Sequence, residues 1–266
     1  MSAHPGVLVE RWLAAVPGRH SRRVFDGRPL PAADAEALDA MCRSFAPYPD
    51  ARVAFLKEAA PAIFTGLVGS YGKVTDAPSA FVFIADSSSP TCEEHTGYTG
   101  EGLVLEANAR GLQTCWISGS FSRATTKTLV ELREGEVVKG VSPVGYARQT
   151  PTTTERVLFG AGRDKHRRSL DQIAPGHEGW PAWAQAGVAA ARVAPSAMNR
   201  QPWRFALDGE AVVLTAGGGD LPGASGRLDC GIAMMHFELG ARSQGADGEW
   251  TPSTDHEIAR WEPSRG

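Results

Sequence analysis

The segment APSAMNRQPWRF, residues 194–205, is the most informative stretch of this chain. Pro195 and Pro202 restrict the backbone on either side of a short polar run. The Ser, Asn and Gln side chains between them can each donate and accept hydrogen bonds. A stiff polar loop of this kind could bind the edge of a planar heterocycle. The alternative is a plain turn that leads into a strand near Phe205, with Trp203 packed in the core.

Basic residues gather in a second segment, RHSRRVF, residues 19–25. In an extended chain the alternate residues Arg19, Ser21 and Arg23 project to one side. Two guanidiniums and a hydroxyl on one side form a site for a phosphate-sized anion, because arginine binds phosphate oxygens bidentately. A solvated basic surface ahead of a helix is the alternative interpretation.

A third segment, GLQTCWISG, covers residues 111–119. Gly119 permits a close approach of the backbone to a ligand. Cys115 lies among Leu112, Trp116 and Ile117, and no His or Asp is near it in sequence to activate the thiol. We therefore expect Cys115 to be a buried structural residue rather than a nucleophile.

Composition and charge restrict the class of protein. The chain has 266 residues, 42% of them hydrophobic, with 27 Lys and Arg against 30 Asp and Glu, a formal net charge of −3. Such a chain can fill a sizeable core, which excludes global disorder. The slightly acidic balance argues against a protein that binds nucleic acid or an anionic membrane, since either needs clustered positive charge.

Targeting signals and metal motifs are missing from the sequence. No apolar run approaches the roughly 18 residues of a membrane span, and the N-terminus lacks the apolar core of a signal peptide. The four cysteines are scattered and fit neither a disulfide framework nor a zinc site. No glycine-rich dinucleotide motif follows a strand. We expect a soluble, cytoplasmic protein with a small-molecule substrate and no metal.

Hydrophobic periodicity alternates between helices and strands, which indicates an α+β fold. Gly111 is placed to end one helix, and Pro143 should interrupt one strand. Residues 150–154 fit a connection. The pattern predicts helices over 32–42, 101–110, 183–193 and 232–239, and strands over 80–85, 137–146 and 211–216.

Several short patterns recur in the same order along the chain. Arg22-Arg23 is echoed by Arg167-Arg168, and the segment 49–55 by the segment 202–207. By this pattern Gly102 and Gly111 bracket one helix as Gly231 and Gly240 bracket another. This order predicts an internal duplication with a shortened second half, covering residues 1–160 and 161–266. Coincidence in a chain rich in alanine and glycine is the alternative.

Together the three segments, with the turn SPVGY at 142–146, resemble motifs of the FMN-dependent nitroreductase family. The resemblance reaches from about Arg19 to Ala241. It implies a nitroreductase-like α+β fold, a mixed sheet flanked by helices, in which two intertwined subunits normally bind FMN at their interface. In ordinary members the proline-asparagine loop follows the arginine motif closely, whereas here it lies in the second half. The chain thus resembles the single-chain branch of the family, an internally duplicated pseudo-dimer that forms one intertwined unit.

The resemblance assigns site residues by position. Ser118 stands where an acidic residue is common, so the electrostatics around the flavin N5 differ from the usual pattern. The implied contacts to the FMN phosphate and ribityl chain are Arg19, His20, Ser21 and Arg23, with Lys165 and Arg167 as a further basic pair. The implied loop from the opposite half is Pro195, Ser196, Ala197 and Asn199, and the segment that approaches N5 is Ile117, Ser118 and Gly119.

The implied activity is that of an FMN-dependent oxidoreductase. Hydride passes from NAD(P)H through the flavin to a small acceptor such as a nitroaromatic or quinone. Because the flavin carries the chemistry, we name no side chain as catalytic. The alternatives are a flavin-binding or storage protein without turnover, another flavin reaction such as flavin fragmentation or reductive dehalogenation, and a structural protein without flavin.

The two halves differ in what they offer a flavin. The first-half counterpart of the loop, residues 45–49, has no asparagine, and a reciprocal site would set Arg167 and Arg168 opposite Tyr48-Pro49-Asp50. Asp50 would repel a phosphate there. We therefore expect one FMN per chain, and a monomer that needs no partner subunit for flavin binding.

Overall fold

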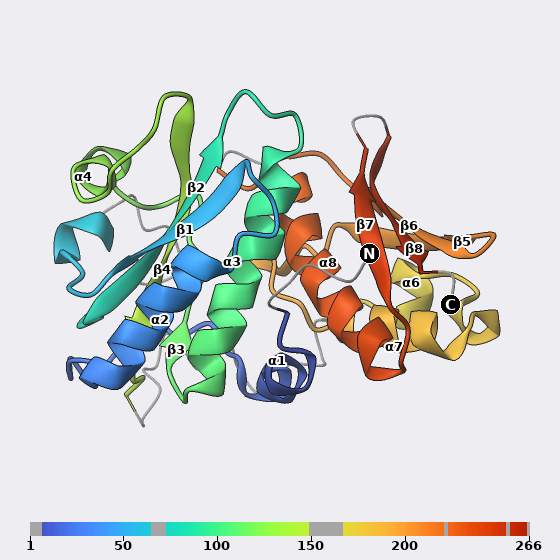
Figure 1. The fold of residues 1–266 in the computed structure, drawn as a ribbon, viewed down its shortest axis with the longest axis horizontal. Coiled ribbons are helices and arrows are strands. Elements are labelled where there is room, and N and C mark those ends of the chain that lie inside the picture. The colour runs from blue at the N-terminus through green and yellow to red at the C-terminus, as the bar shows by residue number, and fades with distance from the viewer. Residues whose placement is uncertain (1–6, 65–72, 149–166, 221–222, 254–255, 265–266) are drawn as a thin grey trace.

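Two four-stranded sheets lie on either side of a pair of long helices in this computed structural model, which describes residues 7–64, 73–148, 167–220, 223–253 and 256–264 (Figure 1). The two central helices are α3 (Cys92–Ala109) and α8 (Gly226–Ser243), and they pack against each other. No helix in these residues is long and apolar enough to cross a membrane, and they contain no cluster of three or more metal-ligating side chains.

The first sheet has the strand order β1-β2-β4-β3, and all its neighbouring strands are antiparallel. Its β2 is apolar along almost its whole length and is buried, as the sequence predicts for a central strand. Parallel pairing occurs in isolated bridges beside this sheet, from Ser21 to Thr114 and from Val24 to Thr75. The strands are β1 (Ala51–Leu56), β2 (Ser79–Asp86), β3 (Gln113–Thr114) and β4 (Glu136–Gly145), and the neighbouring helices are α1 (Val9–Ala15), α2 (Ala32–Ser44) and α4 (Arg123–Lys127).

The second sheet repeats this arrangement, with the antiparallel order β5-β6-β8-β7. Even the irregularity recurs: the register shifts between Phe83 and Ile84 of β2 and between Leu214 and Thr215 of β6. The strands are β5 (Trp203–Asp208), β6 (Ala211–Ala216), β7 (Gly248–Pro252) and β8 (Glu257–Pro263), and the helices are α6 (Leu170–Ile173) and α7 (Ala182–Ala191). Short 3₁₀ turns cover Val16–Gly18, Pro61–Phe64 and His177–Gly179, and a further turn at Ala197–Asn199 contains a non-helical residue, Met198.

The central helices cross at two glycines. A Cβ on Gly97 would lie 2.1 Å from the Leu228 carbonyl oxygen, and one on Gly231 would lie 2.0 Å from that of Glu94. Each glycine is the sixth residue of its helix. A side chain at either position would therefore push the two helices apart.

The sequence-based prediction that Gly102 and Gly111 bracket one helix, and Gly231 and Gly240 another, is wrong. Gly102, Gly231 and Gly240 lie inside helices and do not bracket them. The matching positions are Gly97 with Gly231, and Gly111 with Gly245, which follow α3 and α8 with φ of 78° and 79°. The difference arises because both helices begin earlier than expected, in stretches rich in glycine and polar residues that have low helix propensity.

Most of the other predicted elements are confirmed with shifted ends. The helices expected at 32–42 and 183–193 are α2 and α7, and the strand at 211–216 is β6. Pro143 does not interrupt β4, which continues through it opposite Ala80. The connection predicted at 150–154 lies outside the described residues.

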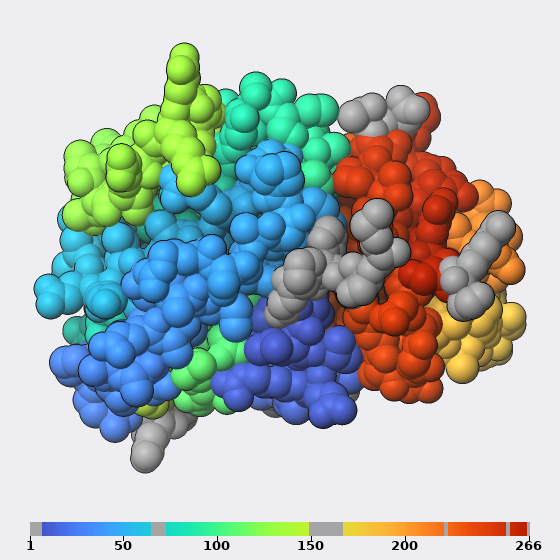
Figure 2. Space-filling model, viewed as in Figure 1, coloured from blue at the N-terminus to red at the C-terminus, as the bar shows by residue number. Residues whose placement is uncertain are grey.

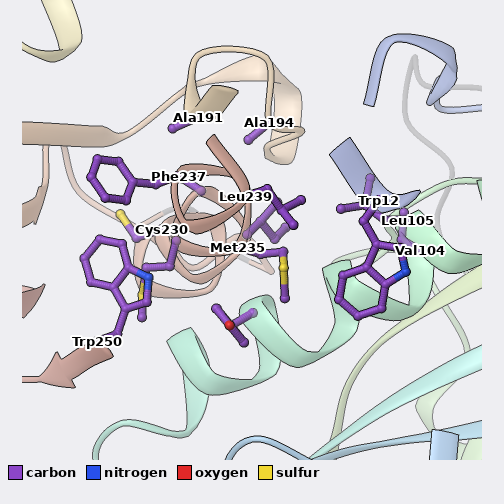
Figure 3. Packing of buried hydrophobic residues seen from close by; sticks show 14 of the residues in the cluster. Trp12, Val104, Leu105, Ala191, Ala194, Cys230, Met235, Phe237, Leu239 and Trp250 are labelled. Carbon is purple, nitrogen blue, oxygen red and sulfur yellow. The ribbon is translucent and has the colours of Figure 1, made fainter. Parts of the chain in front are cut away.

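One hydrophobic core runs through both halves of the chain. Figure 3 shows Trp12, Val104 and Leu105 on one side and Met235 and Leu239 of α8 facing them. The side of α8 that carries Phe237 faces the second sheet and Trp250 (Figure 3). In Figure 2 the surface of α1 (dark blue) lies beside that of the C-terminal elements (red), consistent with contacts from α1 to both α3 and α8.

Candidate functional site

The segment 19–25 is extended and runs beside the first sheet, which is the condition on which the anion-site hypothesis depends. Ser21 forms a parallel bridge with Thr114, and the Arg22 amide donates to the Thr114 carbonyl at 2.9 Å. The Arg23 carbonyl accepts a hydrogen bond from the Thr75 amide at 2.9 Å. Backbone hydrogen bonds therefore hold the segment in place, and its chemistry depends on its side chains.

Arg19 differs from its neighbours in being buried, with 3% of its surface exposed. Its Nε lies 3.9 Å from a carboxylate oxygen of Glu101, a fully buried residue of α3. Burial lowers the pKa of Arg19, and the charge of Glu101 opposes that shift. The solvated interpretation is therefore wrong for Arg19, whereas Ser21 and Arg23 are half-buried and His20 is exposed.

Glu101 joins elements from both halves. Its carboxylate accepts hydrogen bonds from Trp116 Nε1 at 2.7 Å and from His236 Nε2 of α8 at 2.9 Å. Burial lowers the pKa of His236, although Glu101 opposes the shift, so the ring is neutral and donates from Nε2. Trp116 also stacks on Phe83, with ring centroids 3.9 Å apart. The backbone just before residues 117–119 is therefore anchored to α3.

The segment 117–119 itself touches the second half. Ile117 pairs with Val141 of β4 through two backbone hydrogen bonds of 2.9 Å, and its side chain is buried. The Ser118 hydroxyl donates to the Gly223 carbonyl at 2.7 Å. Gly119 faces the same turn, since a Cβ there would lie 3.2 Å from that carbonyl oxygen. Cys115 is buried, as predicted.

The loop that leads into β5 is fixed at its beginning by Arg167. The Arg167 guanidinium donates to the carbonyls of Val193 and Ala194. Further on, the Ser196 hydroxyl accepts from the Gln201 amide at 2.9 Å, which closes the loop on itself. Pro195 is buried, Ser196 and Ala197 are half-buried, and Asn199 is exposed. Trp203, at the end of the loop, is fully buried.

Asp229 of α8 holds the middle of the same loop. Its Oδ1 accepts from the Ala197 amide at 3.0 Å, and its Oδ2 lies 3.3 Å from Arg200 Nη2. Burial raises the pKa of Asp229 to about 6, while the Ala197 amide and Arg200 act against that shift. Arg200 also donates to the Gly219 and Ala224 carbonyls at 3.0 Å. The loop thus reaches the turn that Ser118 contacts.

A cavity of about 450 Å³ opens beside Ser118. Arg123 stands at its side, donates to the Ser118 carbonyl at 3.0 Å and places its guanidinium over the Phe121 ring. The residues that line the cavity include apolar side chains and charges of both signs. The lining residues are Glu93, Ser118, Arg123, Lys127, Val137, Val138, Lys139, Asp220, Gly223, Ala224, Ser225 and Leu228.

The three segments chosen from sequence are thus connected through α3 and α8. Glu101 and His236 lie beside Arg19 and Trp116, and Asp229 lies beside the loop. Sequence reasoning missed these three residues, because each is a single polar residue in a helix and only helix packing reveals its neighbours. Lys165 lies outside the described residues.

The comparisons with known proteins give one family. The family model described as "Putative TM nitroreductase" matches residues 12–241. A comparison with the curated proteins finds no match.

Among solved structures, a protein from Thermotoga maritima described as "a putative nitroreductase" is similar with a TM-score of 0.61 and 20% identity, covering 94% of this chain and 92% of that one. A nitroreductase family protein from Clostridium difficile 630 has a TM-score of 0.45 and 18% identity, covering 61% of this chain and 95% of its own. An FMN-dependent nitroreductase from Clostridium difficile R20291 has a TM-score of 0.42 and 16% identity, covering 52% and 88%. The Thermotoga likeness shows that the fold is nitroreductase-like.

Proposed function

Because the chain belongs to the "Putative TM nitroreductase" family, we propose that it is an FMN-dependent oxidoreductase that passes hydride from NAD(P)H to a small acceptor. The observation that carries this proposal is the junction of the two halves at Ser118 and Gly223. There the backbone of 117–119 from one half meets the turn that also binds Arg200 of the other half's loop. A planar cofactor between the halves could contact both.

The residues present fit a flavin phosphate. Ser21 and Arg23 are half-buried beside the sheet edge, and they offer a hydroxyl and a guanidinium to an anion. Arg19 is buried beside Glu101, whose carboxylate offsets part of its charge, so Arg23 would supply most of the positive charge that meets the phosphate. We assign the phosphate and ribityl contacts to Arg19, His20, Ser21 and Arg23, with Lys165 as a further candidate.

The loop and the backbone segment would hold the isoalloxazine ring. We assign these contacts to Pro195, Ser196, Ala197 and Asn199 on one side and to Ile117, Ser118 and Gly119 on the other. FMN, when bound, supplies the two-electron chemistry, and we name no side chain as catalytic. Arg167 is a weaker candidate for the phosphate, because its guanidinium already binds the Val193 and Ala194 carbonyls.

The second substrate would enter through the cavity beside Ser118. A volume of about 450 Å³ is sufficient for a small aromatic acceptor. Val137, Val138 and Leu228 provide apolar surface for a ring. A nitroaromatic or a quinone fits this description. The dihydronicotinamide of NAD(P)H would occupy the same cavity before the acceptor does.

We further propose that the chain is an internally duplicated pseudo-dimer with halves 1–160 and 161–266. The shared strand order, the shared bulge and the glycines at the helix crossing all support duplication. The boundary between the halves lies outside the described residues. Because its partner half is attached, the chain should bind flavin as a monomer.

The reciprocal flavin site is proposed to be closed. Asp50 Oδ1 is hydrogen-bonded to His95 Nδ1 at 2.6 Å, and Tyr48 stacks on the same imidazole. Arg167 and Arg168 are turned to carbonyls of their own half: those of Val193, Ala194 and Arg200. One FMN per chain follows from this asymmetry.

Titration of the purified full chain with FMN tests the proposal. We expect a yellow complex with one FMN per chain by isothermal titration, which NADH or NADPH reduces and a quinone reoxidises. A chain that binds no flavin would refute the proposed function. Bound FMN that dithionite reduces and NAD(P)H does not would indicate a flavin-binding protein without turnover, and two FMN per chain would refute the closed second site.

A further inference from the structure

The loop 196–201 has an unusual backbone. Met198, Asn199 and Gln201 have φ of 51°, 56° and 51°, in the left-handed region, and none of them is glycine. This region is unfavourable for residues with a Cβ, because the side chain crowds the neighbouring carbonyl. Three such residues within four positions persist only where surrounding contacts hold them.

One carboxylate contacts the loop at two positions, one just before the unusual stretch and one within it. Asp229 accepts from the amide of Ala197, just before Met198, and pairs with Arg200, just after Asn199. The carboxylate is buried and belongs to the first turn of the 18-residue helix α8. A rigid element of the core therefore clamps the loop at two points.

The equivalent position of the other central helix shows that the helix itself does not need this carboxylate. His95 is the fourth residue of α3, as Asp229 is the fourth of α8. His95 stacks on Tyr48 of its loop, and no residue of 45–51 has a left-handed backbone. A carboxylate at the fourth helix position is thus present in the half whose loop has a left-handed backbone, and absent from the half whose loop has none.

We propose that Asp229 is a positioning residue that holds the loop 196–201 in the conformation that meets the flavin, and that its protonation loosens the loop. This inference rests on the proposed function. The charged groups that face Asp229 are Arg200 from the loop and Asp220 from the turn before α8. Protonation would remove the anionic partner of Arg200, which would keep only its hydrogen bonds to the Gly219 and Ala224 carbonyls, and would leave one oxygen to accept from Ala197.

A pH series with Asp229→Asn tests this role. Asparagine retains an oxygen for the Ala197 amide but cannot pair with Arg200 or titrate. We expect the variant to bind riboflavin about tenfold more weakly than the wild type at pH 8, the loss typical of one charge-assisted hydrogen bond. Wild-type affinity should fall towards that of the variant as the pH drops through about 6, the pKa of Asp229. Riboflavin is the probe because the FMN phosphate titrates in the same range.

Glu238→Gln is the matched control. Glu238 is a buried carboxylate of the same helix that pairs with Arg242 and accepts from Tyr98, away from the loop. Its variant should keep wild-type riboflavin affinity and pH dependence. Arg200→Gln should lose at least as much affinity as Asp229→Asn, because it also removes the hydrogen bonds to the Gly219 and Ala224 carbonyls. The double variant should lose no more than Arg200→Gln alone, since both substitutions remove the contact between Arg200 and Asp229.

A readout without flavin separates this inference from the proposed function. The Ala197 amide should exchange hydrogen more quickly in Asp229→Ala than in the wild type, while amides of β6 remain protected. Unchanged exchange, or wild-type riboflavin affinity in Asp229→Asn, would refute the role of Asp229. If the variant and the wild type show the expected difference in exchange but the wild type binds no flavin, the proposed function is refuted and the role of Asp229 in the loop stands.

Discussion

The two loops that lead into the first strand of each sheet occupy corresponding places and have opposite chemistry. Both run to a strand, β1 or β5, and both contact the fourth residue of a central helix. In the first half that contact is a ring stack between Tyr48 and His95, with centroids 3.7 Å apart and planes 5° apart. In the second half it is an ion pair between Arg200 and Asp229.

The difference shows how one backbone frame can serve two purposes. Tyr48 is buried, and its ring also meets Tyr98 edge-on, so the first loop is part of the core. In the second loop Met198 is 48% exposed and Asn199 is exposed, although the backbone there is unfavourable. A packed loop contributes stability, whereas an open polar loop held by a buried carboxylate is suited to contact a ligand.

The largest effect should come from removing the buried aromatic side chain of the first loop. Tyr48→Ala removes a buried aromatic ring and should lower the free energy of unfolding by about 3–5 kcal/mol. Denaturant unfolding measures this loss. Flavin affinity of the folded variant should not change, since the first loop is proposed to bind none. A parallel loss of flavin affinity would show that the two loops are functionally coupled.

The two loops should also differ in how pH affects stability. Asp229 has a folded pKa of about 6 against an ordinary aspartate value of 3.8, so it favours the folded state at low pH, and this contribution is lost as the pH rises through 6. The wild type should therefore lose up to about 3 kcal/mol of unfolding free energy between pH 4 and pH 8 through this group, and Asp229→Asn should not. The difference in stability between the two proteins should shift by that amount in favour of the variant. Chemical denaturation at both pH values measures the shift.

Asp50 in the first loop should give the opposite sign. Burial acts to raise its pKa, but hydrogen bonds from His95 and Ser89 outweigh burial and lower it below 3.8. The contribution of Asp50 to stability is present above its pKa in the unfolded chain, and it is lost as the pH falls through its pKa in the folded protein. Asp50→Asn should thus lose stability at pH 8, and a gain there, measured by the same denaturation, would contradict the assigned pair with His95.

The next effect concerns the arginines that precede the two loops. Arg23→Ala should weaken FMN by about ten- to a hundredfold, or 1.5–3 kcal/mol, and riboflavin much less, because only FMN carries the phosphate. Arg168→Ala, at the corresponding position of the second half, removes a contact to the Arg200 carbonyl and should not discriminate between the flavins. Equal losses for both flavins in Arg23→Ala would make Arg23 structural.

The smallest effect should come from relieving the backbone of the second loop. Met198→Gly should raise the free energy of unfolding by up to about 1 kcal/mol, since glycine tolerates the left-handed region and little buried surface is lost. Ala46→Gly, at the corresponding place in the first loop, should lower it by a similar or smaller amount. Thermal unfolding compares the two, and a destabilised Met198→Gly would mean that the Met198 side chain makes contacts that outweigh its backbone strain.

The sequence by itself predicted the elements whose periodicity is strong and local. The apolar runs at 80–85 and 211–216 became β2 and β6. Fold and family followed from short motifs, whose residues lie close together along the chain. The individual flavin contacts assigned from those motifs stay predictions.

Tertiary structure decided the ends of α3 and α8 and the residues that support the site. Both helices extend through weak helix formers because Gly97 and Gly231 allow them to cross in close contact, and burial outweighs local propensity. Glu101 and Asp229 acquire their roles from partners 15 to 135 residues away, such as Trp116, His236 and Ala197. No local pattern encodes such a partner, because a buried carboxylate is defined by the groups that packing brings to it.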